Sequence, residues 1–376
     1  MAQAVIVRPV KTGSELKSFM KLPWKFGKDD PNFVPPMLFD VNRRLSPKEN
    51  PYFEHAEAEL FVAWRGSEPV GRISAQKDQN YDKHWGGKTG HFGWFECEND
   101  PAAAKALFDA AADWLKKKDR DKMQGPYSFN INDETGILID GFDTPPMCLM
   151  THNPPYYPAL CDGYGFGKAQ DLFAYRMDAT ADAPPDVAKY AEMIRQKEGI
   201  VIRQWNLKDF KREMKLFHEV YNSAWEQNWG MVQLTENELN AYTTELRMLV
   251  DPRISFFAET KDGQVMGASL SLPNFNEYFV KANGHIWGLF PFAWYGLIVS
   301  KKYRSLRVFA LGVKKEFRKS GVGAVFYYDT LMAAKRLGIQ WGEMSWILES
   351  NDAMNRAIQH MGGKVYKTYR IYEKAI

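Results

Sequence analysis

The stretch RVFALGVKKEFRKSGVGAVFYYDTLMAAKRLG, residues 307–338, determines the fold class of the chain. Residues 307–313 form an apolar, β-prone run, and a helical pattern extends from about Ala324 to Leu337, where Gly338 ends it. A loop that contains Gly321 and Gly323 therefore joins a strand to the N-terminus of a helix, which indicates mixed α and β structure.

This loop has the properties of a phosphate-binding site. The first N–H groups of a helix have no intrahelical partner, and the helix dipole places partial positive charge at the same end. Glycine lets a diphosphate approach the backbone, and Arg318 and Lys319 add positive charge. The pattern is neither a Walker A loop nor a GxGxxG fingerprint. A tight strand-to-helix turn without a ligand is the alternative interpretation.

The rest of the chain contains one structural unit twice. Residues 6–22, IVRPVKTGSELKSFMKL, match residues 201–216, VIRQWNLKDFKREMKL, and Arg8 aligns with Arg203. Two strand–turn–strand patterns, LFVAWRGSEPVGRISA at 60–75 and FFAETKDGQVMGASLS at 256–271, follow at nearly the same offset. These are the first two of four matches that occur in the same order, which predicts an internal duplication.

Each copy continues with a strand, an Ala- and Lys-rich helix and a closing run that ends in Tyr-Arg, within GFGKAQDLFAYRM and GGKVYKTYRIYEK. We therefore predict an α+β (mixed α/β) chain of two tandem units, each with a mixed, mostly antiparallel sheet flanked by helices. The predicted boundaries are 1–180 for the first domain, 181–195 for a linker beside the sequence ATADAPPD, and 196–376 for the second domain. The second domain carries an apolar insertion at about 274–305.

The loop residues resemble a known family. Arg318, Lys319, Ser320, Gly321, Val322 and Gly323 match the Q/R-x-x-G-x-G/A motif of the GNAT (Gcn5-related N-acetyltransferase) superfamily, in the same strand–loop–helix context. The resemblance covers about 200–376 directly and 5–178 through the repeat. It implies a tandem duplicated GNAT fold and an N-acyltransferase that uses acetyl-CoA or another acyl-CoA, with acetyl as the expected group.

The resemblance also implies roles for residues. The coenzyme A pyrophosphate binds the loop backbone from Arg318 to Ala324, and the pantetheine arm binds the end of the preceding strand. An amine acceptor, from a small molecule or a peptide, attacks the thioester directly, and the N–H of Val313 polarises the carbonyl. The strand-end residues are Leu311, Gly312 and Val313.

The chain departs from the family pattern in two places that affect the site. The first copy has Glu-Cys-Glu-Asn-Asp-Pro at 96–101 in place of the glycine loop, so we expect a degenerate copy and a single acyl-CoA site. The tyrosine that many family members carry falls near Ile358, and His360 and Tyr366 are possible substitutes. Glu343 and Glu349 on the strand WGEMSWILES are candidates for the general base, and each is alternatively a surface carboxylate.

Two further segments are candidates for acceptor binding. Trp225, Asn228 and Trp229, at the end of a predicted helix, form an amine or sugar pocket or pack on the core. The apolar run 285–300 has four alternative interpretations. It fills an interface between the copies, makes a homodimer contact, covers a large acceptor, or contacts a membrane surface as part of the segment 285–304.

Composition narrows the remaining possibilities. The net charge of +3 gives no reason to expect nucleic-acid binding, and three unpatterned cysteines indicate neither disulfides nor a metal site. The N-terminus lacks a signal-peptide pattern, and the run 285–300 is shorter than the roughly 20 residues of a transmembrane helix. We therefore expect a cytoplasmic protein. Two alternative functions remain. The chain could be a FemX-like aminoacyl transferase that uses tRNA, or a non-catalytic regulator that binds acyl-CoA.

Overall fold

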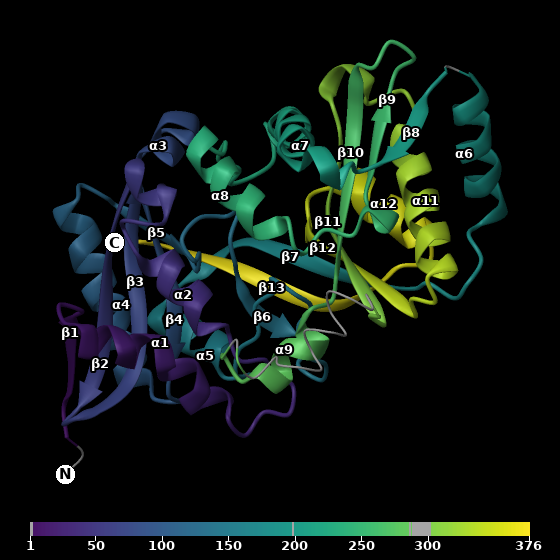
Figure 1. The fold of residues 1–376 in the computed structure, drawn as a ribbon. Helices are drawn as coiled ribbons and strands as arrows, with labels where there is room; N and C mark the ends of the chain where they lie inside the picture. Colours follow the sequence, from purple (N-terminus) through teal and green to yellow (C-terminus); the bar gives the residue numbers. More distant parts are fainter. Residues whose placement is uncertain (1–2, 198, 286, 288–301) are drawn as a thin grey trace. The chain divides into compact units, whose positions relative to one another are not determined.

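The computed structural model describes residues 3–197, 199–285, 287 and 302–376. The chain divides into two compact units. Unit 1 comprises residues 1–172, 278–290 and 367–376, and unit 2 comprises residues 173–277 and 291–366. Figure 1 shows the elements of both, coloured along the sequence.

Unit 1 is built on a mixed sheet in the order β1-β2-β3-β4-β5-β13, with β6 paired to β13. Strands β4 and β5 are parallel, and the pairs β1–β2, β2–β3 and β3–β4 are antiparallel. Its strands are β1 (Val5–Pro9), β2 (Ala56–Arg65), β3 (Glu68–Asp78), β4 (Thr89–Cys97), β5 (Lys122–Gly125) and β6 (Ile137–Asp140). Its helices are α1 (Gly13–Gly27), α2 (Leu38–Leu45), α3 (Gln79–Trp85), α4 (Pro101–Lys117) and α5 (Tyr157–Tyr164).

Unit 2 repeats this arrangement in the order β7-β12-β11-β10-β9-β8. Strands β11 and β12 are parallel, and β8–β9, β9–β10 and β10–β11 are antiparallel. Its strands are β8 (Val201–Gln204), β9 (Phe256–Glu259), β10 (Val265–Pro273), β11 (Ser305–Val313) and β12 (Trp341–Leu348). Its helices are α6 (Pro185–Lys197), α7 (Phe210–Trp225), α8 (Glu236–Leu246), α11 (Val322–Arg336) and α12 (Asp352–His360). The predicted fold class of two tandem mixed units is confirmed.

The boundaries of the units differ from the linear division predicted from the sequence. Strand β7 (Gly167–Asp178) begins in unit 1 and ends in unit 2, whereas β13 (Lys364–Ala375) begins in unit 2 and ends in unit 1. Helix α6 also occupies most of 181–195, the stretch predicted as a linker. Composition indicated a boundary there, but α6 packs its Ala191 and Ile194 into the core of unit 2.

Local signals explain why the helices begin where they do. Thr12 accepts a hydrogen bond from the N–H of Glu15 at the start of α1, and the Glu15 carboxylate accepts one from the N–H of Thr12. Thr235 and Glu238 form the same capping box at the start of α8. These reciprocal bonds satisfy N–H groups that a helix start leaves without partners.

The predicted insertion at 274–305 is described only in part. Helix α9 (Asn276–Ala282) lies within it, and the Glu277 carboxylate accepts hydrogen bonds from the N–H groups of Arg304 and Ser305. Most of the segment 285–304, for which a homodimer or membrane contact was predicted, lies outside the described residues. Within the described part of the chain, every helix is too short or too polar to cross a membrane.

Candidate active site

The parallel strands β11 and β12, at the centre of unit 2, are paired over only part of their length. Their register pairs Ser305 with Trp341 and continues to Val308 with Met344, so the two strands share the first four residues of β11. Along its other edge β11 stays paired with β10 as far as Val313. Beyond Val308 the described residues show no further pair between β11 and β12, and we call the unpaired side of β11 from Phe309 to Val313 the opening.

A β-bulge shapes this end of β11. Ala310 is paired with Leu270 and Val308 with the next residue of β10, so Phe309 is an extra residue in β11. A bulge changes which side chains face each side of the sheet. Accordingly Val308 and Leu311, three residues apart, pack on the same apolar core.

The backbone at the end of β11 offers donors to the opening. The N–H of Lys314 donates to Met266 O of β10 at 2.8 Å. Because backbone N–H groups alternate in direction along a strand, those of Val313 and Leu311 point away from β10, toward the opening. The sequence predicted these two residues, with Gly312, as the segment that holds a pantetheine arm.

The predicted phosphate loop follows directly. A short 3-10 turn, Lys315–Phe317, leads through Arg318, Lys319 and Ser320 to Gly321, the N-cap of α11. Gly321 has φ +87°, a conformation that favours glycine. Helix α11 begins at Val322, two residues before the predicted start near Ala324.

The loop leaves room for a ligand at the helix start. A Cβ added at Gly323 would meet no atom within 4 Å, and the side chains of Arg318 and Lys319 are exposed. An open helix start beside two exposed cationic side chains is compatible with an anionic ligand such as a diphosphate. The side of Gly321 is closed instead, since a Cβ there would lie 2.7 Å from Ile194 Cδ1 of α6.

Helix α7 ends against the same strand end. A Cβ at Gly312 would lie 2.5 Å from the ring of Trp225, which stacks on Tyr221 with ring centroids 4.9 Å apart. The guanidinium of Arg318 donates to Ala224 O at 3.1 Å. Trp225 thus packs on the predicted donor strand, while Asn228 and Trp229 lie half-buried in the turn after α7.

A buried polar cluster occupies the neighbouring strands. The Nε–H of Arg307 donates to Ser345 Oγ at 3.0 Å, and the Ser345 hydroxyl donates to Glu343 Oε1 at 2.6 Å. The Tyr366 hydroxyl donates to Glu343 Oε2. Arg307 is 2% exposed and Glu343 is 0% exposed. We call these four residues the polar cluster.

Two of the four predicted catalytic residues, Glu343 and Tyr366, therefore meet in the structure. The other two lie elsewhere. Strand β12 ends at Leu348, so Glu349 lies beyond the strand that carries Glu343, and Glu349 O accepts a hydrogen bond from Asn355. His360 is 58% exposed and pairs with Asp186 at 2.7 Å.

Arg307 and Ser345 were not predicted from the sequence. Arg307 is a charged residue within an apolar run, and such a residue in a buried strand requires a partner. The register places Arg307 opposite Glu343. The signal available in the sequence was therefore a pair of oppositely charged residues, Arg307 and Glu343, in two successive predicted strands.

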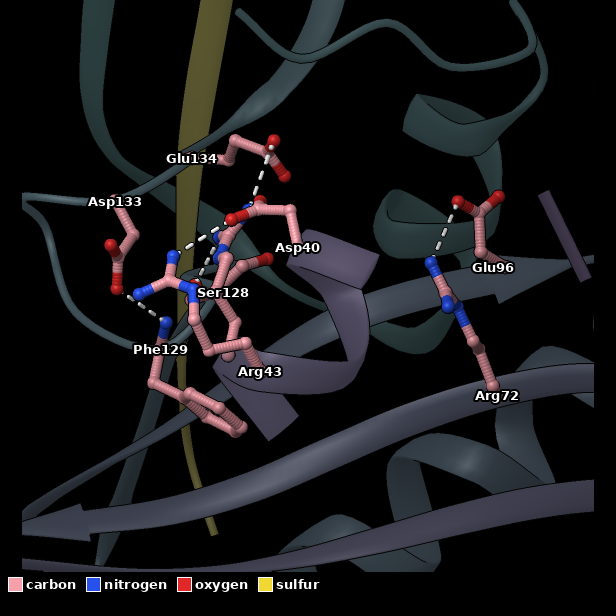
Figure 2. A network of polar contacts seen from close by, with 9 residues as sticks. Asp40, Arg43, Arg72, Glu96, Ser128, Phe129, Asp133 and Glu134 are labelled. Atoms are coloured by element: carbon pink, nitrogen blue, oxygen red, sulfur yellow. Dashed lines mark hydrogen bonds and ion pairs between the residues drawn. The ribbon is translucent and has the colours of Figure 1, made fainter. Parts of the chain in front are cut away.

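Unit 1 has no equivalent opening among its described residues. In unit 1 the register pairs Arg72 of β3 with Glu96 of β4, and in unit 2 it pairs Ala268 of β10 with Gly312 of β11. Because β3 corresponds to β10 and β4 to β11, Glu96 occupies the position of Gly312. Figure 2 shows this Arg72–Glu96 ion pair, at 3.4 Å. Burial raises the pKa of Glu96, which also accepts a hydrogen bond from the Tyr157 hydroxyl at 2.6 Å.

The gap between β4 and β5 is also closed. Tyr127 N–H donates to Phe92 O at 2.8 Å, and a Cβ at Gly93 would collide with Tyr127 O. Arg44 holds the following loop by donating to Ser128 O at 2.6 Å. Within that loop Phe129 N–H donates to Asp133 (Figure 2). These contacts support the prediction that the first copy is a degenerate unit.

A buried histidine in unit 1 predicts how stability depends on pH. Desolvation lowers the pKa of His91 from 6.5 to about 4, so the folded protein keeps it neutral while the unfolded chain protonates it below pH 6.5. We expect stability to fall as the pH falls from 6.5 to about 4, by up to about 1.4 kcal/mol per pH unit for this group. The free energy of unfolding, measured with a denaturant at several pH values, should fall less steeply with pH in His91→Gln than in the wild type. Unchanged slopes, with the surface variant His84→Gln as control, would contradict this assignment.

The described residues contain no group of three or more His, Cys, Asp or Glu side chains that could hold a metal ion.

Two curated proteins are similar to this chain over nearly its whole length. The bacterial ceramide synthase of Caulobacter vibrioides (strain NA1000 / CB15N) is 40% identical over 378 residues, which cover 98% of this chain and 97% of that protein. Protein YghO of Escherichia coli (strain K12) is 38% identical over 379 residues, which cover 99% of this chain and 95% of that protein. No protein-family model matches the sequence.

Solved structures share the fold at low sequence identity. A tandem GNAT protein from the clavulanic acid biosynthesis pathway superposes with a TM-score of 0.58 and 12% identity, over 99% of this chain and 98% of that one. A GCN5-related N-acetyltransferase from Sphaerobacter thermophilus gives 0.54 and 13%, over 99% and 95%. The predicted tandem GNAT fold is confirmed. The chain thus belongs to the family that includes the bacterial ceramide synthase of C. vibrioides and protein YghO of E. coli.

Proposed function

We propose that this chain is an acyl-CoA-dependent N-acyltransferase that joins a fatty acyl group to the amine of a sphingoid base. The acceptor follows from the 40% identical relative named as a ceramide synthase, because a ceramide is the amide of such a base. The single geometric observation that carries the proposal is the opening at the end of β11, which is followed by a helix N-terminus and lies beside strands that carry a buried carboxylate bonded to a half-buried phenol.

The donor side of the proposal rests on the loop and the strand end. The loop backbone from Arg318 to Ala324 would hold the pyrophosphate, and Arg318 and Lys319 would add charge at its mouth. Acyl-CoA supplies an activated acyl group as a thioester. We assign the N–H of Val313, which points toward the opening, the role of donor to the thioester carbonyl oxygen. Leu311 and Gly312 would line the pantetheine arm.

The acceptor side of the proposal rests on the polar cluster. A protonated amine must lose a proton before it attacks, and the half-buried Tyr366 hydroxyl is already hydrogen-bonded to the Glu343 carboxylate. We infer that Tyr366 passes the amine proton to Glu343, and that Arg307 and Ser345 fix the carboxylate. The C–N bond forms as the C–S bond breaks, and the leaving thiolate takes the second proton of the amine and departs as free coenzyme A. Trp225, Asn228 and Trp229 remain candidates for contact with the acceptor.

Two other functions predict different results. A FemX-like aminoacyl transferase would take its group from tRNA, and a regulator would bind acyl-CoA without turnover. Neither has an observation that favours it over the acyl-CoA enzyme, since unit 2 keeps both the loop and a candidate base.

The test is to incubate the purified protein with acetyl-CoA or palmitoyl-CoA and a panel of amines: sphinganine, a polyamine and a lysine peptide. We expect free coenzyme A and an N-acyl product, identified by mass spectrometry, with palmitoyl-CoA and sphinganine. A protein that is stabilised thermally by acyl-CoA yet releases no thiol with any amine would instead be a regulator. Transfer from aminoacyl-tRNA alone would favour the FemX-like function.

A further inference from the structure

Helix α6 packs along α11, the helix that follows the phosphate loop (Figure 1). Asp182, just before α6, pairs with Lys335 in the last turn of α11. Near its other end α6 is joined to α11 by the ion pair of Arg195 with Asp329, and Ile194 is buried in the core of unit 2. The two helices are therefore antiparallel, and the C-terminal half of α6 lies beside the start of α11.

Tyr190 brings a hydroxyl group from α6 to the phosphate loop. Its Oη lies 2.9 Å from the position that a Cβ on Gly321, the N-cap of α11, would take. Tyr190 precedes the buried Ile194 by about one helical turn, and it is 43% exposed. Within the described part of the chain its hydroxyl has no hydrogen-bond partner. The hydroxyl is therefore available to a ligand bound at the start of α11.

The surroundings of this hydroxyl favour a negatively charged ligand. It lies beside the first turn of α11, where backbone N–H groups without helical partners and the helix dipole attract anions. A Cβ at Gly323 would meet no atom within 4 Å, so there is open space beside this turn. Arg318 and Lys319 are exposed in the same loop. A hydroxyl in such a place can donate a charge-assisted hydrogen bond to a phosphate oxygen.

We propose that Tyr190 binds coenzyme A, with its hydroxyl donating to a phosphate oxygen of the nucleotide half of the donor. The inference rests on the proposed acyl-CoA dependence. It adds to the site a residue from a different helix, outside the motif 318–323. Tyr190 contributes to binding of the donor and takes no part in the transfer of the acyl group.

The test is Tyr190→Phe, which removes the hydroxyl and keeps the ring. We expect the affinity for coenzyme A, measured by calorimetric titration, to fall about tenfold, because a hydrogen bond to a charged group is lost. Tyr328→Phe is the matched control, since the Tyr328 ring packs between the same two helices, 5.9 Å from the guanidinium carbon of Arg195. Its affinity should match that of the wild type. Equal affinities in Tyr190→Phe and the wild type would overturn the assignment.

A second readout separates binding of the phosphates from a structural role. Tyr190→Phe should lower kcat/KM for palmitoyl-CoA but not for S-palmitoyl-pantetheine, which has no phosphate group. An equal fall with both thioesters would overturn the assignment, because the hydroxyl would then act on the fold or on the transfer step.

Dephospho-coenzyme A identifies the phosphate that accepts the hydrogen bond. If Tyr190→Phe weakens its binding as much as that of coenzyme A, the acceptor is the diphosphate. If the effect of the substitution disappears, the acceptor is the 3′-phosphate. Both results support the assignment of Tyr190. A wild type that does not bind coenzyme A at all would instead overturn the proposed function itself.

Discussion

Gly323→Glu is expected to lower the affinity for coenzyme A about a hundredfold, or about 2.7 kcal/mol, since like charges brought together at a binding site cost several kcal/mol. The side chain would enter open space at the start of α11, and its carboxylate would meet the pyrophosphate. No protein atom lies within 4 Å of the added Cβ, so the fold should remain intact. Calorimetric titration with coenzyme A and a thermal melt of the free protein measure the two effects.

Gly338→Ala is the matched control for this prediction. Gly338 follows the other end of α11, has φ +70° and also has open space at its Cβ. Its replacement should cost about 1 kcal/mol of stability through backbone strain and leave coenzyme A binding unchanged. Equal affinities in the wild type and Gly323→Glu would show that the loop does not bind the diphosphate.

Replacing Glu343 by glutamine should lower kcat by about a hundredfold or more, the usual contribution of a general base. Glutamine keeps the shape of the side chain but cannot accept the proton that Tyr366 would pass on. The rate of the wild type should fall at low pH as the base becomes protonated, and this acidic limb should be absent from the variant. A pH–rate profile with a fixed acyl-CoA and amine measures both.

Tyr366→Phe separates catalysis from stability at this site. Glu343 is buried beside Arg307, and removal of one charge from a buried pair can cost about 3–5 kcal/mol. Tyr366→Phe removes only one hydroxyl and should therefore fold, yet it should also lose activity. Glu349→Gln, in the turn after β12, should leave the rate near that of the wild type. Full activity in Tyr366→Phe and in a folded Glu343→Gln would exclude the proposed base.

The duplication was readable from the sequence because each element of a unit is specified locally. Strand pairs, turns and helices of the two copies depend on residue patterns over ten to twenty positions, and four such patterns recurred in order. The boundaries of the units were not readable in the same way. Strands β7 and β13 each contribute to both units, and a strand carries no local mark of the sheet that it joins.

The candidate base likewise combines residues that the sequence could name with an arrangement that only the structure shows. Glu343 and Tyr366 were named singly from their types and neighbourhoods, with Glu349 and His360 as equal candidates. Sequence separation gives no information on which of four polar residues share a buried site. Only the register of β11 with β12, and the return of the chain into β13, bring the carboxylate, the phenol and Arg307 together.

The sequence by itself determined the loop that joins β11 to α11, because its donors, glycines and charges are contiguous and helix geometry fixes their common direction. It also determined that a second such loop is missing from the first copy. The tertiary structure alone decided the polar cluster, whose residues come from the three separate strands β11, β12 and β13. Such features depend on which side chains meet after packing. The bulge at Phe309 changes which side chains of β11 point to each face of the sheet, and hydrophobic periodicity does not reveal it.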